Sequence, residues 1–192
     1  MLTNFDKGRT MVQNKKEGIH MSDIERRLKA LEDRAELQDL AVRYFVATDD
    51  DDFATLEALF APGAEFHAGG FAGGTDRAAI MVFLRSARAN MGITIHTPHY
   101  SLITFTGDDT ATGVVGAHLE IAMAGQSLFG AVRYYDKYQR LHGKWHFSKR
   151  EMLAVHMGPW EQVATSLTAD LRVRWPGGKP QAADLPARRE NL

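Results

Sequence analysis

The chain has 192 residues, a formal net charge of -1 and 24% charged residues. A net charge this close to zero gives no electrostatic reason to expect nucleic acid or an anionic membrane as a partner. Cysteine is absent, which excludes disulfides, cysteine-ligated zinc, thiolate nucleophiles and iron–sulfur clusters and favours a cytoplasmic protein. No apolar run has the length of a membrane span. The length suits one domain with tails.

The N-terminal residues 1–21 are predicted to form a flexible extension, because they are polar and show no hydrophobic periodicity. They contain no signal-peptide hydrophobic region, and Met21 is an alternative natural start. Ser22 and Glu25 have the spacing of a capping box, which predicts the start of a helix. An apolar stripe at helical spacing then predicts a first helix from about residue 23 to residue 48.

An acidic run from Asp49 to Asp52 interrupts this helix, since adjacent aspartates are poor in helix interiors and good as caps. Asp52 is predicted to cap a short second helix that Pro62 and Gly63 end. A strand over 64–68 and a glycine-rich loop over 69–74 follow. Thr75 is then predicted to cap a third helix.

After Gly92 the hydrophobic pattern changes to period two, which indicates strands. The predicted strands cover 99–106, 110–124, 127–140 and 144–156, and glycine-containing turns join them. This order predicts an α+β fold in which a curved antiparallel sheet wraps around N-terminal helices. The predicted domain covers 22–157. Residues 158–192 would add a helix that begins at Pro159 and extends past Leu171, then a mobile tail from Lys179.

Four residues could carry acid–base chemistry: Tyr44, Asp49, His96 and Arg150. A carboxylate bonded to one imidazole nitrogen fixes the tautomer and raises the basicity of the other nitrogen. On an ideal helix Tyr44 and Asp49 do not share a face, so they would converge only if the helix loosened near Thr48. Each residue taken alone also has a purely structural interpretation. His96 would be a structural histidine and Asp49 a solvated helix cap. Tyr44 would be a core aromatic, and Arg150 would form a surface or interface ion pair.

Period two in the last strand places Arg150 with His146 and Ser148, opposite Trp145 and Phe147. There Arg150 could stabilise a departing anion or pair with the carboxylate of residue 49.

The histidines also invite a metal-site interpretation, with His96 and His99 three residues apart and His67 as a third ligand. In an extended chain this spacing points the two rings to opposite sides, so no metal is expected. His118 is predicted to face outward, opposite the apolar side chains of its strand. The glycines at 69–74 lack the order and context of a nucleotide-binding motif.

A helical layer packed on a curved sheet leaves an apolar pocket suited to a small molecule. We expect apolar side chains from both layers to line it, namely Phe45, Phe83, Ala117, Leu119, Phe129 and Met152.

Residues 31–40 and 59–66, with Tyr44 and Asp49 between them, resemble the opening of the SnoaL-like branch of the NTF2-like superfamily. Residues 136–147 resemble its closing hairpin. Within this branch the chain is similar to the cofactor-independent lyases, which include hexachlorocyclohexane dehydrochlorinase, bile acid 7α-dehydratase and scytalone dehydratase. The resemblance implies a conical α+β barrel, often a dimer or trimer, in which C-terminal segments cross between subunits.

The resemblance also implies roles for the four candidates. A catalytic Asp–His pair matches Asp49 and His96, and an arginine in the last strand matches Arg150. A tyrosine five residues before the aspartate matches Tyr44. Asp50 could replace its neighbour as the carboxylate, and His99 could replace His96 as the base.

The expected function is therefore that of a lyase of the dehydratase or dehydrohalogenase type, or of an isomerase. The expected substrates are small and largely apolar, with cyclic compounds among them. Neither a metal nor an organic cofactor is expected, and the expected assembly is a homodimer or homotrimer. The alternatives are a non-catalytic module that binds a ligand or a partner subunit, and a cyclase or hydrolase on the same scaffold.

Overall fold

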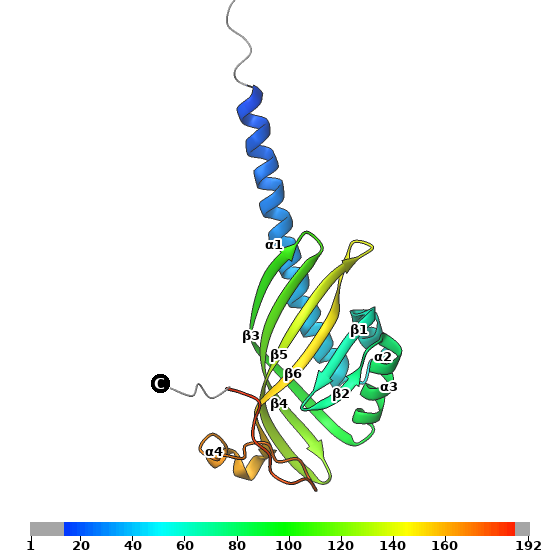
Figure 1. Cartoon of the computed structure of the whole chain (residues 1–192), viewed down its shortest axis with the longest axis vertical. Coiled ribbons are helices and arrows are strands. Elements are labelled where there is room, and N and C mark those ends of the chain that lie inside the picture. Colours follow the sequence, from blue (N-terminus) through cyan, green and yellow to red (C-terminus); the bar gives the residue numbers. More distant parts are fainter. Residues whose placement is uncertain (1–13, 187–192) are drawn as a thin grey trace, which may run out of the picture. The chain divides into compact units, whose positions relative to one another are not determined.

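The computed structural model describes residues 14–186, which divide after Glu36 into two units (Figure 1). Helix α1 (Asn14–Asp49) contributes to both units. In the first unit Lys29 Nζ donates to Asp33 Oδ2 at 2.8 Å, one helical turn away. The prediction that a capping box at Ser22 starts this helix is wrong, because the backbone is already helical from Asn14. The remainder of the predicted extension, residues 1–13, lies outside the described residues.

The second unit contains the other helices and all six strands. In chain order these elements are α2 (Phe53–Leu59), β1 (Phe60–Ala68), β2 (Phe71–Gly74), α3 (Arg77–Arg88), β3 (Met91–Gly107), β4 (Thr110–Met123), β5 (Gln126–Leu141), β6 (Lys144–Pro159), a 3₁₀ turn (Trp160–Gln162) and α4 (Val163–Ser166). The predicted α+β fold is confirmed. Within residues 14–186, none of the helices combines the length and the apolar character needed to cross a membrane.

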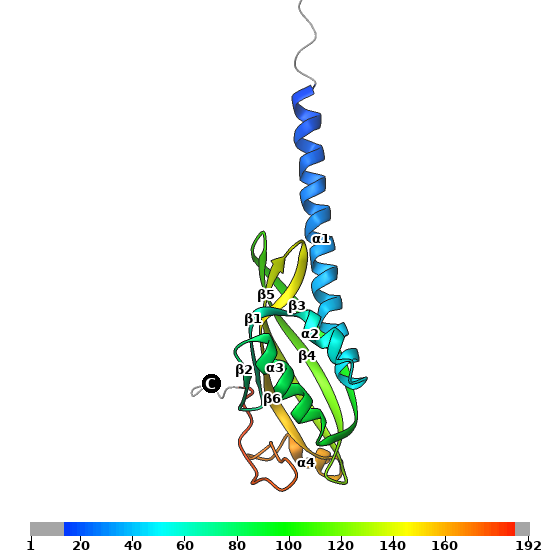
Figure 2. The ribbon, with the colours of Figure 1, turned by 90° about the vertical axis from the view of Figure 1, so that its right-hand side faces the viewer.

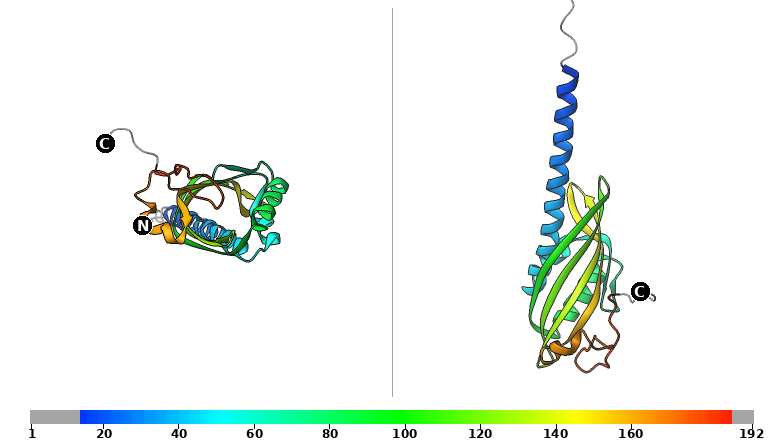
Figure 3. Two further views of the ribbon diagram at one scale, coloured as in Figure 1. Left: turned by 90° about the horizontal axis from the view of Figure 1, so that it is seen from below. Right: turned by 90° about the vertical axis from the view of Figure 1, so that its left-hand side faces the viewer.

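The strands form one curved sheet in the order β2-β1-β6-β5-β4-β3. Strands β3 to β6 are an antiparallel meander, whereas β1 runs parallel to β6. The observed sheet is therefore mixed, whereas the prediction was an antiparallel sheet. The hairpins after β4 and β5 have two-residue turns with positive φ, including Ala124 and His142 at 50°, as the twist of such hairpins requires. Figures 2 and 3 show the sheet curving around residues 37–49 of α1, with α3 on the facing side.

Several predicted boundaries differ from the structure. Asp76, not Thr75, caps α3, because its carboxylate accepts from the Ala79 N–H at 2.9 Å. Helix α2 ends at Leu59, before the proline, since β1 begins at the next residue. The glycine-rich segment 69–74 contains the short strand β2.

The C-terminal segment also differs from its prediction. Its helix ends at Ser166, so the predicted continuation past Leu171 is wrong. Val173 instead bridges Met157 and Gln181, and the Leu185 N–H donates to the Ala154 carbonyl at 3.0 Å. Residues 187–192 of the predicted mobile tail lie outside the described residues.

A β-bulge in β6 changes the direction of Arg150. Tyr138 pairs with Phe147 and Lys137 pairs with Lys149, so Ser148 is an extra residue without a counterpart. A bulge shifts the alternation of the side chains that follow it by one position, up to the next irregularity in the strand. Arg150 therefore faces the core on the same side as Phe147, and the predicted period-two assignment is wrong there.

In the core, Arg150 is fully buried beside an equally buried Asp136. Its Nη1 donates to Asp136 Oδ2 at 3.3 Å, and the Tyr138 hydroxyl donates to the same oxygen at 2.9 Å. Aromatic rings surround the guanidinium, with centroids 4.2 Å away for Tyr44 and 4.0 Å for Tyr134. Cation–π contacts thus supply part of the solvation that water would otherwise give.

Burial raises the pKa of Asp136 to about 6, against the opposing effects of Arg150 and the Tyr138 hydroxyl. A folded-state pKa above the unfolded value means that the folded chain binds the extra proton. The stability that this carboxyl contributes is therefore greatest below its unfolded pKa and decreases as the pH rises through about 6.

We predict that Arg150→Met destabilises the protein more at pH 8 than at pH 5, because removing the cation raises the pKa of Asp136 further. Leaving a buried charge without its partner costs about 3–5 kcal/mol. Urea unfolding at the two pH values measures the difference. Lys149→Met, which removes a part-exposed lysine beside Glu151, is the control and should cost less than about 1 kcal/mol. An equal loss at both pH values for Arg150→Met would contradict this account.

Candidate active site

Two residues of α1, Phe45 and Asp49, hold the imidazole of His96. They are four residues apart and so lie on one face of the helix. The Phe45 ring stacks on the imidazole at 5.3 Å between centroids with an interplanar angle of 14°. The Asp49 Oδ1 atom lies 2.6 Å from His96 Nδ1. One helix face therefore fixes both the plane of the ring and its rotation.

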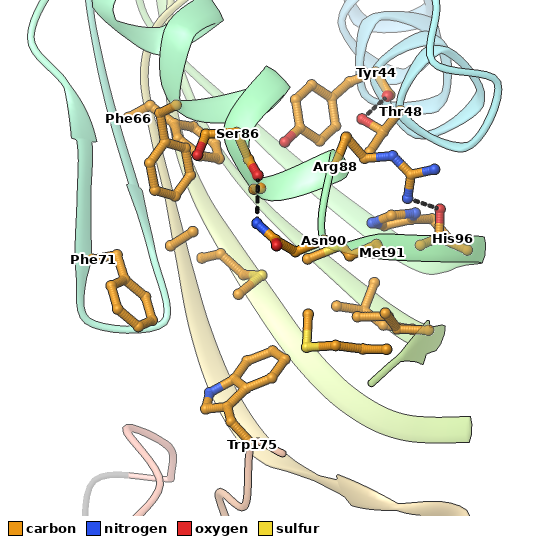
Figure 4. A pocket seen from close by; sticks show the side chains of 18 of the residues that line it. Tyr44, Thr48, Phe66, Phe71, Ser86, Arg88, Asn90, Met91, His96 and Trp175 are labelled. Atoms are coloured by element: carbon orange, nitrogen blue, oxygen red, sulfur yellow. Dashed lines mark hydrogen bonds between the residues drawn. The ribbon is translucent and has the colours of Figure 1, made fainter. Parts of the chain in front are cut away.

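The adjacent face of α1 carries Tyr44 and Thr48, which line a cavity. The Thr48 hydroxyl donates to the Tyr44 carbonyl at 2.7 Å, and in Figure 4 the Tyr44 hydroxyl points away from the helix into the cavity. The helix stays regular here, since the Asp50 N–H donates to the Val46 carbonyl at 3.0 Å. Tyr44 and Asp49 thus reach the site from neighbouring helix faces, without the loosening that their spacing had suggested.

The Asp49 carboxylate accepts three hydrogen bonds, all from β3. The Thr94 hydroxyl donates to Oδ1 at 2.7 Å, the His96 backbone N–H donates to Oδ2 at 2.8 Å, and the imidazole supplies the third bond. Strand β3 is at the edge of the sheet, where outward backbone N–H groups have no strand partner. Burial raises the pKa of Asp49, but the hydrogen bonds from His96 and Thr94 outweigh it and lower the pKa below its usual value.

An ionised carboxylate accepts hydrogen bonds and donates none, so His96 Nδ1 must carry the hydrogen in this contact. The neutral imidazole then has its lone pair on Nε2. His96 is among the residues that line the cavity, so this lone pair is the one available for a ligand.

Arg88, at the end of α3, forms a second set of contacts beside Asp49. Its Nη1 donates to Thr94 Oγ1 at 2.9 Å, its Nε to Asp51 Oδ1 at 2.6 Å, and its Nη2 to the Gly92 carbonyl at 3.2 Å. The hydrogen bond from Arg88 lowers the pKa of Asp51. The last turn of α3 is thereby joined to both the acidic run and β3.

The cavity has a volume of about 440 Å³ and is mainly apolar. Figure 4 shows Arg88, His96, Tyr44 and Thr48 gathered at the end near α1, with Trp175 at the opposite end. The apolar lining between them includes Phe66, Phe71, Met91, Ile121, Met123 and Met152. A small molecule bound here would have one polar end and an apolar body in contact with the walls.

The structure places the six expected lining side chains in different surroundings. Phe83, Leu119 and Met152 line the cavity. Phe45 instead packs behind His96, and Ala117 is buried elsewhere in the core.

Phe129 is on the opposite face of the sheet from the cavity. Its ring lies 5.0 Å from that of the outward-facing His118 and 5.1 Å from that of Trp160. The error arose because Leu128 and Gly130, not Phe129, occupy the inward positions of β5.

Arg150 is not among the residues that line the cavity. It pairs with Asp136 and not with Asp49. Its guanidinium lies over the inner side of the Tyr44 and Tyr134 rings, both of which do line the cavity. Any influence of Arg150 on a bound molecule would therefore pass through these rings.

The other histidines lie apart from this site. His99 packs against His118 with ring centroids 4.2 Å apart, on the face opposite His96. Among residues 22–186, whose side chains the structure describes, no cluster of three or more histidine and carboxylate side chains is arranged to hold a metal ion.

Sequence reasoning missed Arg88, Thr94, Tyr134 and Trp175. Thr94 had a signal, because it precedes His96 by two residues and so shares its strand face. Arg88 and Trp175 had none, since only the folded chain brings them to the cavity.

The model of the SnoaL-like domain family matches residues 29–151. The match spans more than half of the chain, which therefore belongs to the SnoaL-like family. No curated protein matches the chain in sequence.

Solved structures with the same fold include several small enzymes. Hexachlorocyclohexane dehydrochlorinase LinA type 2 is 22% identical, with a TM-score of 0.66 over 78% of this chain and 98% of that one. LinA type 3 from Novosphingobium barchaimii LL02 is 22% identical, with a TM-score of 0.65 over 71% and 95%. A candidate scytalone dehydratase from Novosphingobium aromaticivorans is 18% identical, with a TM-score of 0.67 over 84% and 98%. These likenesses establish the NTF2-like cone fold and not a shared reaction.

We predict that Met123→Trp weakens binding of the apolar fluorophore 1-anilinonaphthalene-8-sulfonate by tenfold or more, about 1.4 kcal/mol, because the indole occupies space in the cavity. Fluorescence titration measures the affinity. Val82→Trp is the control, since Val82 is exposed on α3 and does not line the cavity. An equal loss in both variants would show that the dye binds elsewhere.

Proposed function

We propose that this member of the SnoaL-like family is a cofactor-independent lyase, of the dehydratase or dehydrohalogenase type, or an isomerase, that acts on a small, largely apolar substrate. The observation that carries the proposal is the contact of 2.6 Å between Asp49 and His96 Nδ1 at the polar end of an apolar cavity. It leaves His96 Nε2 as a base directed at the space where a substrate would lie.

In the proposed elimination, His96 Nε2 removes a proton from a substrate carbon. The electron pair of that C–H bond forms the new double bond, and the leaving group departs with its own bonding pair. The imidazolium formed on His96 is stabilised by the adjacent Asp49 carboxylate. In an isomerisation, the same nitrogen would return the proton to a different carbon.

Tyr44 is the proposed acid or hydrogen-bond donor toward the leaving group or a developing oxyanion. Burial raises its pKa, with Arg150 opposing this effect, so the phenol stays protonated and can donate. The Arg150 guanidinium, 4.2 Å from the centroid of the Tyr44 ring, would position this phenol instead of contacting the substrate.

The structural neighbours support a lyase without establishing one. Two bear the name hexachlorocyclohexane dehydrochlorinase and another that of a candidate scytalone dehydratase. Loss of hydrogen chloride and loss of water both need a base near a C–H bond and a donor near the leaving group. The arrangement of His96 and Tyr44 around one cavity suits either reaction.

We predict that the protein releases chloride from hexachlorocyclohexane or water from scytalone, and that His96→Gln lowers kcat by about 10²–10⁴-fold because the base is lost. Chloride and absorbance assays, with ¹H NMR of each compound in D₂O, detect turnover or carbon–proton exchange. His99→Gln, on the other face of the sheet, is the matched control and should leave the rate unchanged. Binding with neither turnover nor exchange would favour a non-catalytic ligand-binding module.

We predict that Tyr44→Phe lowers kcat more than it changes KM, because a donor to the leaving group acts mainly in the transition state. The expected loss is about 10–10³-fold, measured on whichever compound the wild type converts. The phenylalanine ring keeps the contact with Arg150, so circular dichroism melting should change little. A rise in KM at constant kcat would instead assign Tyr44 to substrate binding.

A further inference from the structure

We propose that Arg88 is a positioning residue, which acts through the Thr94 hydroxyl to hold Asp49 in the orientation that binds the His96 ring. This inference rests on the proposed function only in treating His96 Nε2 as the base. The chain of contacts itself is independent of any substrate.

The chemistry of each side chain fixes the direction of its hydrogen bonds. An arginine donates through every guanidinium nitrogen and accepts nothing, whereas a threonine hydroxyl has one hydrogen and two lone pairs. In the contact of 2.9 Å with Arg88 Nη1, Thr94 Oγ1 must therefore be the acceptor. Its only hydrogen remains free for Asp49 Oδ1, 2.7 Å away.

The direction of the hydrogen bond to the imidazole is fixed in the same way. Asp49 Oδ1 accepts from Thr94 at 2.7 Å and lies 2.6 Å from His96 Nδ1. Both contacts to one oxygen require donors, so Nδ1 carries a hydrogen. The three hydrogen bonds that link Arg88, Thr94, Asp49 and His96 can thus each have one direction only. Thr94 and His96 both donate to the ionised carboxylate of Asp49.

Arg88 is itself held in one orientation. Its side chain is 8% exposed, and each of its three guanidinium nitrogens donates a hydrogen bond of 2.6–3.3 Å to Asp51, Thr94 or Gly92. A guanidinium with all its nitrogens engaged loses most of its rotational freedom. Arg88 therefore acts on the site as a fixed donor and not as a mobile cation that contacts the substrate.

Asp51 supplies the balancing negative charge from a strained backbone. Its φ is 55°, in the left-handed region, which costs a residue other than glycine of order 1 kcal/mol. This conformation directs the carboxylate at Arg88, with Oδ1 2.6 Å from Nε and Oδ2 3.3 Å from Nη2. The strained backbone of Asp51 thus places its carboxylate where it holds Arg88 in contact with Thr94.

A purely structural role for Arg88 makes a different prediction. If Arg88 only joined α3 to the acidic run, its loss would lower stability without changing the titration of Asp49. If it positions Asp49 through Thr94, then its loss must raise the pKa of Asp49 where the Thr94 hydroxyl is present. The same loss must add nothing further in a chain that already carries Thr94→Val, which keeps the shape of the side chain without the hydroxyl.

The test is ¹³C NMR titration of the Asp49 carboxyl, with the His96 Nδ1–H proton resonance followed in parallel. The charged and titratable groups around this carboxyl are Asp50, Asp51, Arg88, His96 and Tyr134. We expect Thr94→Val and Arg88→Met to raise the pKa of Asp49 by about half a unit or more, since the carboxylate loses a donor or its orientation. We also expect faster solvent exchange of the Nδ1–H proton. Thr94→Ser, which restores the hydroxyl, should return both readouts to the wild-type values.

Two matched controls lie close by. Thr97→Val changes an exposed threonine of the same strand, and Arg85→Met removes the other arginine of the last turn of α3, whose guanidinium packs on Phe53. Neither should move the titration of Asp49. An unchanged Asp49 pKa in Arg88→Met, or the full Arg88→Met shift added on top of Thr94→Val, would overturn the proposal. Arg88→Lys takes the place of Arg88→Met if that variant does not fold.

Activity separates this inference from the proposed function. On any compound that the wild type converts, Thr94→Val should lower kcat about tenfold at nearly constant KM. If His96→Gln abolishes turnover while Thr94→Val changes neither the Asp49 titration nor kcat, the base assignment holds and the role of Arg88 fails. If no compound is converted, the NMR titration still decides whether Arg88 positions Asp49.

Discussion

The ionised carboxylate of Asp49 is the group on which the geometry of the site depends. It lies at the last residue of α1 and accepts three hydrogen bonds from the edge strand β3. A half-buried carboxylate requires such donors, because it has lost part of its hydration. The backbone donor from His96 also satisfies an N–H at the open edge of the sheet. One side chain thereby joins helix to strand and orients the imidazole.

Three of the four consecutive aspartates after Thr48 have separate tasks because the chain turns sharply there. Asp49 faces β3, Asp51 adopts a left-handed backbone and holds Arg88, and Asp52 caps α2 by accepting from the Thr55 N–H at 3.0 Å. Repulsion within such a run is offset when each carboxylate has its own donors. The run is therefore a junction between two helices and the candidate site.

Two polar centres lie close together but in different surroundings. Arg150 and Asp136 are fully buried and enclosed by aromatic rings, whereas Asp49 and His96 adjoin the cavity. The rings of Tyr44 and Tyr134 belong to both centres, since they contact Arg150 on one side and line the cavity on the other. Arg150 of the buried pair thus packs against the ring of the phenol that the proposed reaction uses.

The sequence by itself determined the α+β order and the four-strand meander, because periodicity and turn residues are local signals. It named Asp49 and His96 as candidates through the family resemblance, whereas the contact of 2.6 Å between them comes from the fold. It did not determine where Arg150 points, since a single bulge at Ser148 reverses the alternation of β6. Nor did it place Arg88 at the site, because that residue reaches Thr94 only after α3 packs beside β3. Contacts between segments distant in sequence depend on register and packing, which only the tertiary structure decides.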